Sequence, residues 1–340
     1  MVGIEYFISE NVAPLGTRRI IVYDEAGTKL GFIPLGKLTP PNPNEMLYRV
    51  GVLSDAHVPN VISESVADFK RALEYLTGVE KVDFITICGD LTYYGTDAEL
   101  AQYKSLADAN RGTTPIYAIT GNHENYPEGV ADGDIENRIE SYTGHYLYYS
   151  FTKGDDVYIM VGIKSNSAEG VFTNAELQWL YETLEANRNK RCFVFEHAFP
   201  WDGSGDILDK YSTDLLAGDS GQVFLSLMRH YKNVLWFHGH SHCKFDGQQY
   251  GGIANMDKLY GMYSLHIPSL AYPIEGDRSG GFLYAESEGY VMDVYENGIH
   301  LRGRDFVKGE FLPIASYWLD TTLQTIPAGT YTDSTGTITK

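Results

Sequence analysis

Five short motifs of this sequence combine acidic, amide and imidazole side chains, and each directly follows a short apolar run. Along the chain the motifs read SDAH, CGDL, TGNHE, FEH and HGHSH. Their candidate metal-binding residues are Asp55, His57, Asp90, Asn122, His197, His240 and His242. Imidazoles, carboxylates and one amide oxygen, without a thiolate, form a donor set for hard-to-borderline divalent metal ions. The motifs therefore predict a metal centre.

Spacing and glycine placement favour a shared site. A separation of two residues in D-x-H and H-x-H lets both side chains point the same way from an extended or turning backbone. Glycine precedes Asp90, Asn122 and His240, and we expect these glycines to allow sharp turns that aim the next side chain into one crevice. The two oxygens of Asp90 could each hold one metal ion, which would keep two ions ~3.5–4 Å apart around a bridging hydroxide.

The charge of such a centre predicts its substrate. Two dications bring about four positive charges, and Asp55, Asp90 and a hydroxide remove about three, which leaves a site suited to an anionic phosphate ester. The ions would clamp the phosphate oxygens and lower the pKa of the bridging water. His123 directly follows Asn122, so we expect it to face the substrate and to stabilise or protonate the leaving-group oxygen.

Other residues near the motifs have plainer interpretations. His197 belongs to the shortest motif, so His145 and His230 remain alternatives to it as a ligand. We expect Glu124 to orient a ligand rather than to react. The remaining candidates are His238 and Cys243, expected in the core, and Trp201, Tyr272 and Arg278, expected on loops that could reach the crevice.

The elements that must position these motifs alternate between strands and helices. Apolar runs predict strands over residues 48–53, 82–88, 116–120, 157–163, 191–196, 234–237 and 262–267. Helices are predicted over 63–76 and after two capping boxes, which start at Thr96 and Thr173. This alternation predicts βαβ units in a sheet covered by helices, with ligands beyond the carboxyl ends of the strands. After residue 281, Gly-punctuated runs predict antiparallel strands.

The order of the motifs, D-x-H, GD, GNH(E/D), H and GHxH, resembles that of the calcineurin-like metallophosphoesterases over roughly residues 46–270. The resemblance implies an α/β (α+β) fold, a four-layer αββα sandwich, and hydrolysis of a phosphate ester with two divalent or mixed-valence ions of Mn, Fe, Zn or Co. We expect Asp90, Asn122 and His123 to be the catalytic residues. The first ion would be held by Asp55, His57, Asp90 and His242. The second ion would be held by Asp90, Asn122, His197 and His240.

Two branches of that family compete. The segments GDLTYYGTDAEL, PIYAITGNHE, FEHAFP and HGHSH are most similar to the cyclic-nucleotide and glycerophosphodiester phosphodiesterases. Residues 89–93 (GDLTY) also satisfy the GDxxY motif of the purple acid phosphatases, which have glycine where this chain has His57. His57 and Tyr93 would compete for one coordination position, and we favour His57. A purple, tyrosinate-coloured protein would reverse that choice.

Three regions divide the chain. Residues 1–45 hold a predicted β-hairpin, with strands at 18–23 and 29–35, and a proline-rich linker. Residues 46–312 form the predicted metallophosphoesterase domain, and residues 313–340 form a threonine-rich, extended tail. The tail could be a flexible appendage or an arm ordered against a partner. Both ends are therefore candidates for contact with a second copy or a larger assembly.

Composition limits the partners and the location. The net charge of −19 at pH 7 argues against a nucleic-acid polymer or an anionic membrane held by bulk electrostatics. Cys88, Cys192 and Cys243 have no paired spacing, so we expect reduced thiols. The first residues lack the regions of a secretory signal, and no apolar run is long enough to span a membrane. We expect a soluble protein of the cytoplasm or of an extracellular or virion assembly.

The sequence thus predicts a phosphoesterase with a phosphodiester as the favoured substrate. The diester choice follows from the branch resemblance and from the lack of an arginine cluster beside the motifs, which a dianionic monoester would favour. Two alternatives stay open. One is a phosphomonoesterase of the purple acid phosphatase type, and the other is a structural or binding module that tethers a phosphoesterase domain in a surface or virion-like assembly.

Overall fold

A computed structural model describes most of the chain. The described residues are 42–59, 64–126, 132–164, 172–199, 218–245, 256–257, 262–274 and 285–339, together with the backbone of 12–14, 18–23 and 29–36. The loop residues Trp201 and Arg278, and the turn of the N-terminal hairpin, lie outside the described residues.

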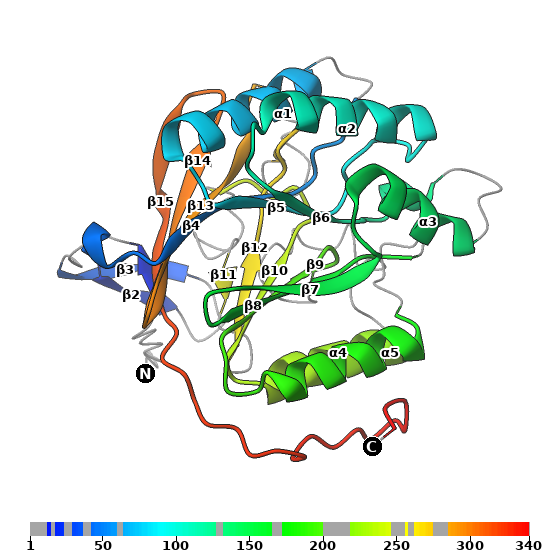
Figure 1. Cartoon of the computed structure of the whole chain (residues 1–340). Coiled ribbons are helices and arrows are strands. Elements are labelled where there is room, and N and C mark those ends of the chain that lie inside the picture. Colours follow the sequence, from blue (N-terminus) through cyan, green and yellow to red (C-terminus); the bar gives the residue numbers. More distant parts are fainter. Residues whose placement is uncertain are drawn as a thin grey trace.

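Two β-sheets pack face to face between two layers of helices, which is the expected four-layer αββα sandwich (Figure 1). The first sheet has the order β1-β15-β14-β13-β4-β5-β6. Its strands are β1 (Val12–Pro14), β4 (Tyr48–Leu53), β5 (Phe84–Cys88), β6 (Ile116–Ile119), β13 (Glu288–Tyr295), β14 (Gly298–Asp305) and β15 (Glu310–Asp320). Strands β4, β5 and β6 are parallel to one another, so their carboxyl ends lie at one edge of the sheet.

The second sheet has the order β11-β12-β10-β9-β8-β7. Its strands are β7 (Tyr148–Lys153), β8 (Asp156–Val161), β9 (Cys192–Glu196), β10 (Val234–His238), β11 (Met256–Asp257) and β12 (Tyr263–His266). Strands β8, β9, β10 and β12 are parallel, and the antiparallel strands β7 and β11 form the two edges.

Helices cover the outer face of each sheet (Figure 1). The first sheet carries α1 (Glu64–Glu74), which continues as η2 (Tyr75–Glu80), α2 (Asp97–Asn110) and α3 (Asp132–Thr143). The second sheet carries α4 (Asn174–Ala186) and α5 (Gly218–His230). Both predicted capping boxes are present, because Thr96 pairs with Glu99 and Thr173 pairs with Glu176. None of the helices in the described ranges is long and apolar enough to cross a membrane.

Apolar side chains fill three layers of this sandwich. The layer between the sheets is rich in aromatic rings, among them Tyr158, Phe195 and Phe237. A second layer packs α1 and α2 against the first sheet, and a third packs α4 and α5 against the second. Since both sheets are buried on both faces, the polar loops at their edges remain the places where a site can form.

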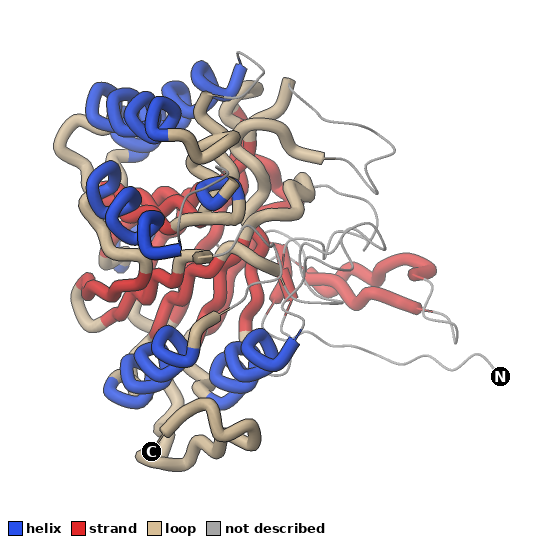
Figure 2. The backbone as a smooth tube through the Cα atoms, turned by 90° about the vertical axis from the view of Figure 1, so that its right-hand side faces the viewer, coloured by secondary structure: helices blue, strands red, loops and turns tan. Residues whose placement is uncertain are grey.

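The N-terminal hairpin forms as predicted. Strand β2 (Arg18–Tyr23) pairs antiparallel with β3 (Lys29–Gly36), and Figure 2 shows the pair beside the sandwich. Strand β1 instead pairs with β15 of the first sheet. The predicted N-terminal region therefore contributes one strand to the main sheet.

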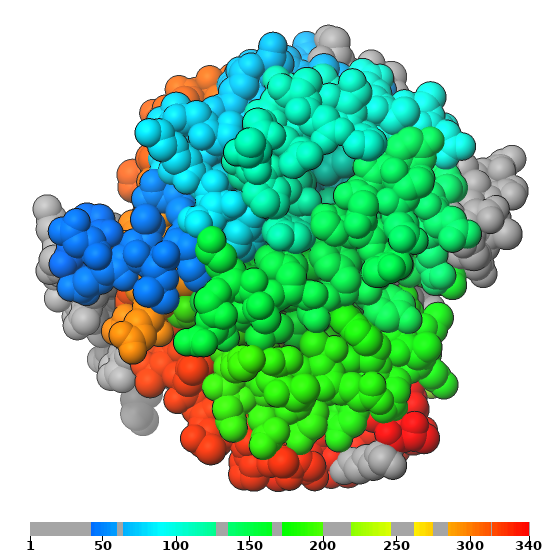
Figure 3. Space-filling model, viewed as in Figure 1, coloured from blue at the N-terminus to red at the C-terminus, as the bar shows by residue number. Residues whose placement is uncertain are grey.

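Residues 321–339, here called the C-terminal strap, pack along α4 and α5 of the same chain (Figure 3). Arg188 Nε donates to the carbonyl of Ile326 at 3.0 Å, and the backbone N–H of Thr339 donates to Gln178 Oε1 at 2.9 Å. The buried side chains of the strap, which join the outer apolar layer, are Ile326, Tyr331 and Ile338. The tail is thus ordered against its own chain.

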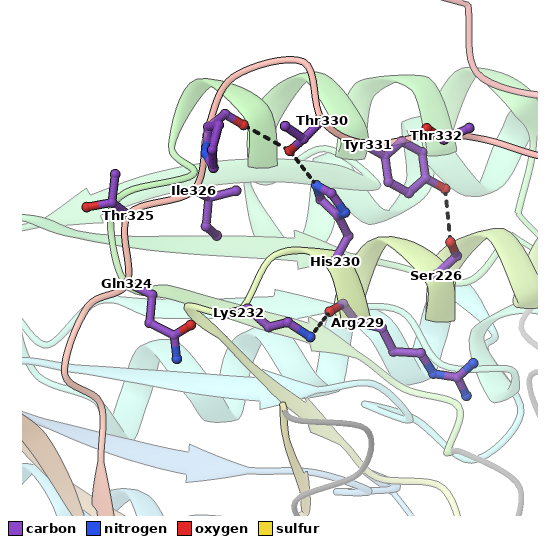
Figure 4. Close-up of a pocket in the computed structure, with 11 residues that line it drawn as sticks. Ser226, Arg229, His230, Lys232, Gln324, Thr325, Ile326, Thr330, Tyr331 and Thr332 are labelled. Atoms are coloured by element: carbon purple, nitrogen blue, oxygen red, sulfur yellow. Dashed lines mark hydrogen bonds between the residues drawn. The ribbon is translucent and has the colours of Figure 1, made fainter.

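A groove of about 640 Å³ separates the strap from the end of α5 (Figure 4). His230 Nε2 lies 3.1 Å from Thr330 Oγ1 beside this groove, and Tyr331 Oη donates to Ser226 Oγ at 3.4 Å. Lys232 Nζ donates to the carbonyl of Arg229 at 2.9 Å. Lys232 therefore has a structural use, since it satisfies one of the last carbonyls of the helix.

Several elements differ from the prediction. Helices α3 and α5 and strand β7 are not predicted, and β15 runs to Asp320, past the boundary expected at residue 312. Helix α5 opens with the residues GDSG, and glycine lowers helix propensity by about 1 kcal/mol per residue. Packing of Phe224 and Leu227 against the second sheet compensates for that weakness.

Candidate metal centre

The five motifs meet at one edge of the sandwich. Asp55, Asp90 and Asn122 follow the carboxyl ends of β4, β5 and β6. His197 and His240 follow the carboxyl ends of β9 and β10. Six of the predicted ligands form two groups, in each of which the ligand atoms lie within 4.8 Å of one another. The first group is Asp55, His57, Asp90 and His242, and the second is Asp90, His197 and His240.

In the first group, imidazole nitrogens and carboxylate oxygens converge. The Nε2 atoms of His57 and His242 are 3.1 Å apart. Asp55 Oδ1 lies 3.0 Å from His242 Nε2 and 4.0 Å from His57 Nε2. All of these side chains are buried. Two imidazoles and carboxylate oxygens around one point are a donor set that suits a divalent cation.

Asp90 joins the two groups. Its Oδ2 lies 3.2 Å from His197 Nε2 and 3.7 Å from His57 Nε2. Its Oδ1 accepts the backbone N–H of His123 at 3.0 Å. The sequence predicts that each carboxylate oxygen serves one ion, whereas the structure engages Oδ1 with the backbone. Oδ2 is therefore the atom that faces the imidazoles of both groups.

Asn122 precedes His123, whose backbone N–H contacts Asp90, and the Asn122 amide is held in one orientation. Its Nδ2 donates to Tyr126 Oη at 2.9 Å, whereas its Oδ1 is buried without a hydrogen-bond partner. An unsatisfied buried acceptor costs ~1–3 kcal/mol, and a bound cation would satisfy it. The donor atoms of both groups thus fit a pair of cations.

Backbone carbonyls contact Nδ1 of two candidate ligand histidines. His197 Nδ1 lies 2.6 Å from the carbonyl oxygen of Cys88, and His242 Nδ1 lies 3.2 Å from that of Tyr272. A carbonyl oxygen only accepts, so Nδ1 of each ring carries a hydrogen. In the neutral imidazole, Nε2 is then the nitrogen with a lone pair that can bind metal. Such carbonyl contacts fix the ring orientation of metal-binding histidines.

The backbone at the ligands adopts a conformation that L-residues rarely use. Positive φ angles occur at Asp55 (52°), His57 (44°), Asp90 (50°), His240 (70°) and His242 (58°). Within the described residues, Lys81 is the one other non-glycine residue with a positive φ. Each such residue costs on the order of 1–3 kcal/mol and persists where the surroundings hold it. The concentration of this strain at the candidate ligands marks a functional site.

The glycines that precede ligands act mainly by lacking a side chain. Gly89 has a φ of 83°, which agrees with the predicted sharp turn, but Gly121 and Gly239 do not have a positive φ. A Cβ on Gly121 would overlap with Asp90 Oδ1, and one on Gly239 would overlap with Asp55 Oδ2. These two glycines therefore allow neighbouring loops to approach, which corrects the predicted role.

Neighbouring charges keep the two carboxylates ionised, and burial keeps one imidazole neutral. Burial raises the pKa of Asp90, but the charge of His197 opposes it and the pKa lies well below its usual value. Burial likewise raises the pKa of Asp55, and His242 with His197 brings it below the usual range. Burial lowers the pKa of His240 to about 3, so this imidazole is neutral at pH 7. Neutral imidazole and ionised carboxylate are the forms that bind metal.

Glu124 ties the Asp90 loop to the Asn122 loop. Its Oε1 accepts from the backbone N–H and the hydroxyl of Thr92 at 2.8 and 3.0 Å, and its Oε2 accepts from the N–H of Gly121 at 2.8 Å. Burial, and then the charge of Asp90, raises the pKa of Glu124 to about 7. These contacts hold the two loops together, and an orienting role for Glu124 stays a prediction.

His123 faces the same cluster from its rim. Its Nδ1 lies 2.5 Å from the carbonyl oxygen of Tyr93, so Nδ1 carries a hydrogen and Nε2 is turned toward Asp90 Oδ2, 3.8 Å away. The side chain is partly exposed, unlike the fully buried His57 and His197. His123 is thus placed between the cluster and solvent.

The alternatives to these residues lie elsewhere. His145 Nε2 contacts the carbonyl of Ile116, and His230 contacts the strap, so neither joins the cluster with His197. His238 and Cys243 are buried, as expected. The ring of Tyr272 lies against two candidate ligands, with centroids 5.0 Å from that of His57 and 4.4 Å from that of His242.

His57 and Tyr93 differ in how they meet the cluster. His57 belongs to the first group, whereas Tyr93 is half-buried with its ring centroid 5.7 Å from that of His57. The carbonyl of Tyr93 holds His123. This geometry favours His57 as the ligand.

Sequence reasoning missed Tyr126. The residue lies four positions after Asn122, and the two are the caps of the short helix η3 (His123–Asn125), so one helical turn brings them together. The spacing was visible in the segment NHENY, but no turn was predicted there.

The family model described as calcineurin-like phosphoesterase matches residues 48–244, which is more than half of the chain. No curated protein matches the sequence. Among solved structures, a purple acid phosphatase from yellow lupin (Lupinus luteus) seeds is similar with a TM-score of 0.54 and 17% identity. The similarity covers 89% of this chain and 59% of the lupin protein, so this chain spans less than two thirds of that protein's length. At this identity the likeness shows a shared fold.

Two shorter proteins are also similar. A predicted phosphoesterase from Streptococcus pneumoniae has 14% identity and a TM-score of 0.37, covering 80% of this chain and 97% of that protein. Vacuolar Protein Sorting 29 from Cryptosporidium parvum has 12% identity and a TM-score of 0.38, covering 78% of this chain and 94% of that protein.

Proposed function

Since this chain belongs to the calcineurin-like phosphoesterase family, we propose that it is a dinuclear metal-dependent hydrolase of phosphate esters that prefers phosphodiesters. The proposed cofactors are two ions from Mn, Fe, Zn or Co. The observation that carries the proposal is the sharing of Asp90 by two buried groups of metal-binding side chains. One carboxylate between two groups is the arrangement that a two-metal site needs.

Each ion has its own ligands in this proposal. The first is held by Asp55, His57, Asp90 and His242, and the second by Asp90, Asn122, His197 and His240. Support for Asn122 comes from its buried, unpartnered Oδ1 and from the contact that Tyr126 makes with its Nδ2.

When bound, the ions supply a nucleophile from water and stabilise negative charge on the phosphoryl oxygens. Asp90 and Asn122 hold the centre, and His123 assists departure of the leaving group. Because the Nδ1 hydrogen of His123 is engaged by the Tyr93 carbonyl, only Nε2 remains to donate a hydrogen bond or a proton. That atom contacts the leaving-group oxygen.

The preference for diesters rests on charge. A monoester dianion is best held by bidentate arginine, and the five motifs contain no arginine. A diester monoanion needs less added positive charge than a monoester does. The comparison of the two ester types is therefore the first experiment.

Turnover of bis(p-nitrophenyl) phosphate and of p-nitrophenyl phosphate by the metal-loaded protein tests the proposal. Wild type should favour the diester. Asp90→Asn should lose at least ~100-fold in kcat, and His123→Ala should lose ~10²–10⁴-fold. Asp97→Asn is the matched control, because Asp97 is an exposed residue of the first turn of α2. Equal turnover in all four proteins would refute the assignment.

The purple acid phosphatase alternative makes a different prediction. It requires Tyr93 as an iron ligand and a preference for the monoester. A visible tyrosinate absorption band that Tyr93→Phe removes, together with faster monoester turnover, would replace the present proposal.

A further inference from the structure

A run of aromatic rings leads from the candidate metal centre toward solvent. The ring centroid of Tyr93 lies 5.7 Å from that of His57 and 5.5 Å from that of His123. From these rings the run continues in two directions, since Tyr94 lies 4.7 Å from Tyr93 and Tyr126 lies 4.3 Å from His123. The inner rings thus contact the cluster, and the outer rings lie one ring further out.

The two outer rings are exposed. Tyr94 is 52% exposed and Tyr126 is 40% exposed. In the described part of the chain, one further tyrosine, Tyr146, is exposed to this degree, at 65%. Exposure of large aromatic surface next to a reactive centre is informative, since such surface usually serves recognition.

The loop that carries Tyr94 is held rigidly against the His123 turn. The N–H of Tyr94 donates to Glu99 Oε2 at 2.8 Å, and the N–H of Gly95 donates to Thr92 Oγ1 at 3.1 Å. Gly95 has a φ of 66°, and a Cβ there would lie 2.6 Å from the carbonyl oxygen of His123. The position of Tyr94 is therefore set in advance, which lowers the entropic cost of binding on its ring.

We propose that Tyr94 and Tyr126 form a stacking platform that selects small phosphate esters carrying a planar ring. The proposal rests on the proposed phosphoesterase function and specifies its substrate class. With the phosphate at the metal ligands, a ring attached through a sugar or similar spacer reaches past Tyr93 and His123 to the outer rings. Stacking on aromatic side chains strengthens binding of a base by ~1–3 kcal/mol.

The chemistry favours a small ester over a polymer. A net charge of −19 repels a polyanion, whereas one phosphate group meets only the local charge of the metal centre. The planar ring is expected on the leaving-group side of the ester, because His123 lies between Asp90 and Tyr126.

Two pairs of competitive inhibitors of bis(p-nitrophenyl) phosphate hydrolysis test the platform. Adenosine 5′-monophosphate and ribose 5-phosphate differ only in the base, and phenyl phosphate and methyl phosphate place a ring directly on the ester. For wild type we expect adenosine 5′-monophosphate to have an inhibition constant about tenfold lower than ribose 5-phosphate. Tyr94→Ala should bring that ratio close to one. Tyr146→Ala is the matched control and should keep the wild-type ratio.

The outcomes separate the platform from the proposed function. The ratio of inhibition constants could instead be larger for the phenyl and methyl pair than for the sugar pair. If Tyr94→Ala lowers that larger ratio to one, the preferred ring is attached directly to the ester oxygen. An active wild type with ratios near one, or a ratio unchanged in Tyr94→Ala, overturns the platform and leaves the function standing. If the metal-loaded protein hydrolyses no ester, the function fails. In that case calorimetry measures the dissociation constants of the same compounds, and ratios near one overturn the platform.

Discussion

At the scale of single residues, hydrogen bonds from neighbouring groups determine which atom of each candidate ligand is turned toward the centre. The carbonyls of Cys88 and Tyr272 hold Nδ1 of His197 and His242, and Tyr126 holds the amide of Asn122. Residue types and motif order could be predicted from the sequence. These contacts could not, because each partner except Tyr126 comes from a distant segment.

Removing the Tyr126 hydroxyl tests this orienting role. In Tyr126→Phe the ring still packs on His123, but Asn122 Nδ2 loses its acceptor. Loss of such an outer contact typically weakens metal binding 10–100-fold, so we expect affinity for one of the two ions to fall ~10-fold in a chelator competition titration. Tyr146→Phe, at an exposed tyrosine, should bind both ions as wild type does. Unchanged affinity in Tyr126→Phe would show that Asn122 is oriented by other means.

The close approach of the Asn122 loop to Asp90 at Gly121 gives a second prediction. In Gly121→Ala the new Cβ would meet both the Oδ1 and the backbone nitrogen of Asp90. Since backbone cannot move aside cheaply, we expect loss of metal and at least ~100-fold lower kcat/KM, with the fold retained by circular dichroism.

Gly78→Ala is the control for that change. A Cβ at Gly78 meets nothing within 4 Å, and alanine in a helix is favoured over glycine by about 1 kcal/mol. Wild-type turnover in Gly121→Ala would show that the Asp90 and Asn122 loops need not approach so closely.

At the scale of elements, the strands that carry the motifs were the most predictable part. Strand β4 matches its prediction at both ends, and β5, β6, β9 and β10 differ by a residue or two. Helices α3 and α5 were not predicted, because their sequences are polar or glycine-rich at the start. Packing against the rest of the fold stabilises these helices more than their own propensity does. The C-terminal strap escaped for a similar reason, since an extended segment has no periodic pattern.

The strap stabilises the α4–α5 layer through a few buried side chains. Tyr331 is 2% exposed and packs near Tyr181 and Tyr231. Tyr331→Ala should lower the free energy of unfolding by about 3 kcal/mol in urea denaturation. Leu323→Ala, in the same strap but half exposed, should change it by no more than about 0.5 kcal/mol. Equal effects of the two substitutions would show that the strap contributes no packing of its own.

A cross-strand pair in the first sheet predicts sensitivity to acid. His300 on β14 faces Asp293 on β13, with Arg302 and Arg49 nearby, and its Nε2 lies 3.2 Å from Ser316 Oγ. Burial lowers the pKa of His300 to about 4, against an unfolded value of about 6.5. Between these two pH values the unfolded chain binds a proton that the folded chain does not. Stability is therefore lost as pH falls from about 6.5 to 4.

The substitution His300→Gln isolates that contribution. From pH 7 to pH 5, wild type should lose on the order of 1–2 kcal/mol more free energy of unfolding than the variant. Protonation elsewhere affects both proteins alike, so urea denaturation at the two pH values measures the difference. Parallel loss in both proteins would place the acid sensitivity at other groups.

At the scale of the whole molecule, the two sheets are joined at the end opposite the candidate metal centre. Arg191, just before β9, pairs with Asp156 at 2.6 Å and donates to the carbonyl of Tyr295 at 2.8 Å. Asp156 also accepts from the hydroxyl of Tyr48, the first residue of β4, at 2.5 Å. This buried network links both sheets at the amino ends of their parallel strands. The carboxyl ends are thereby positioned to bring five loops together.

Such long-range pairing limits what sequence reasoning can reach. The family resemblance predicted the sandwich and the shared edge, and the motifs predicted which side chains gather there. The Arg191 network was not predictable, because no local pattern marks its contacts. Arg191 lies 35 residues from Asp156 and 104 from Tyr295, and Tyr48 lies 108 residues from Asp156. The left-handed backbone at the ligands has no signature in residue type either.

Anomalous diffraction from crystals grown with Mn²⁺ measures the central claim directly. The expected result is two peaks that share Asp90, one also contacted by Asp55, His57 and His242 and the other by Asn122, His197 and His240. A single peak, or peaks that do not involve Asp90, would contradict the account.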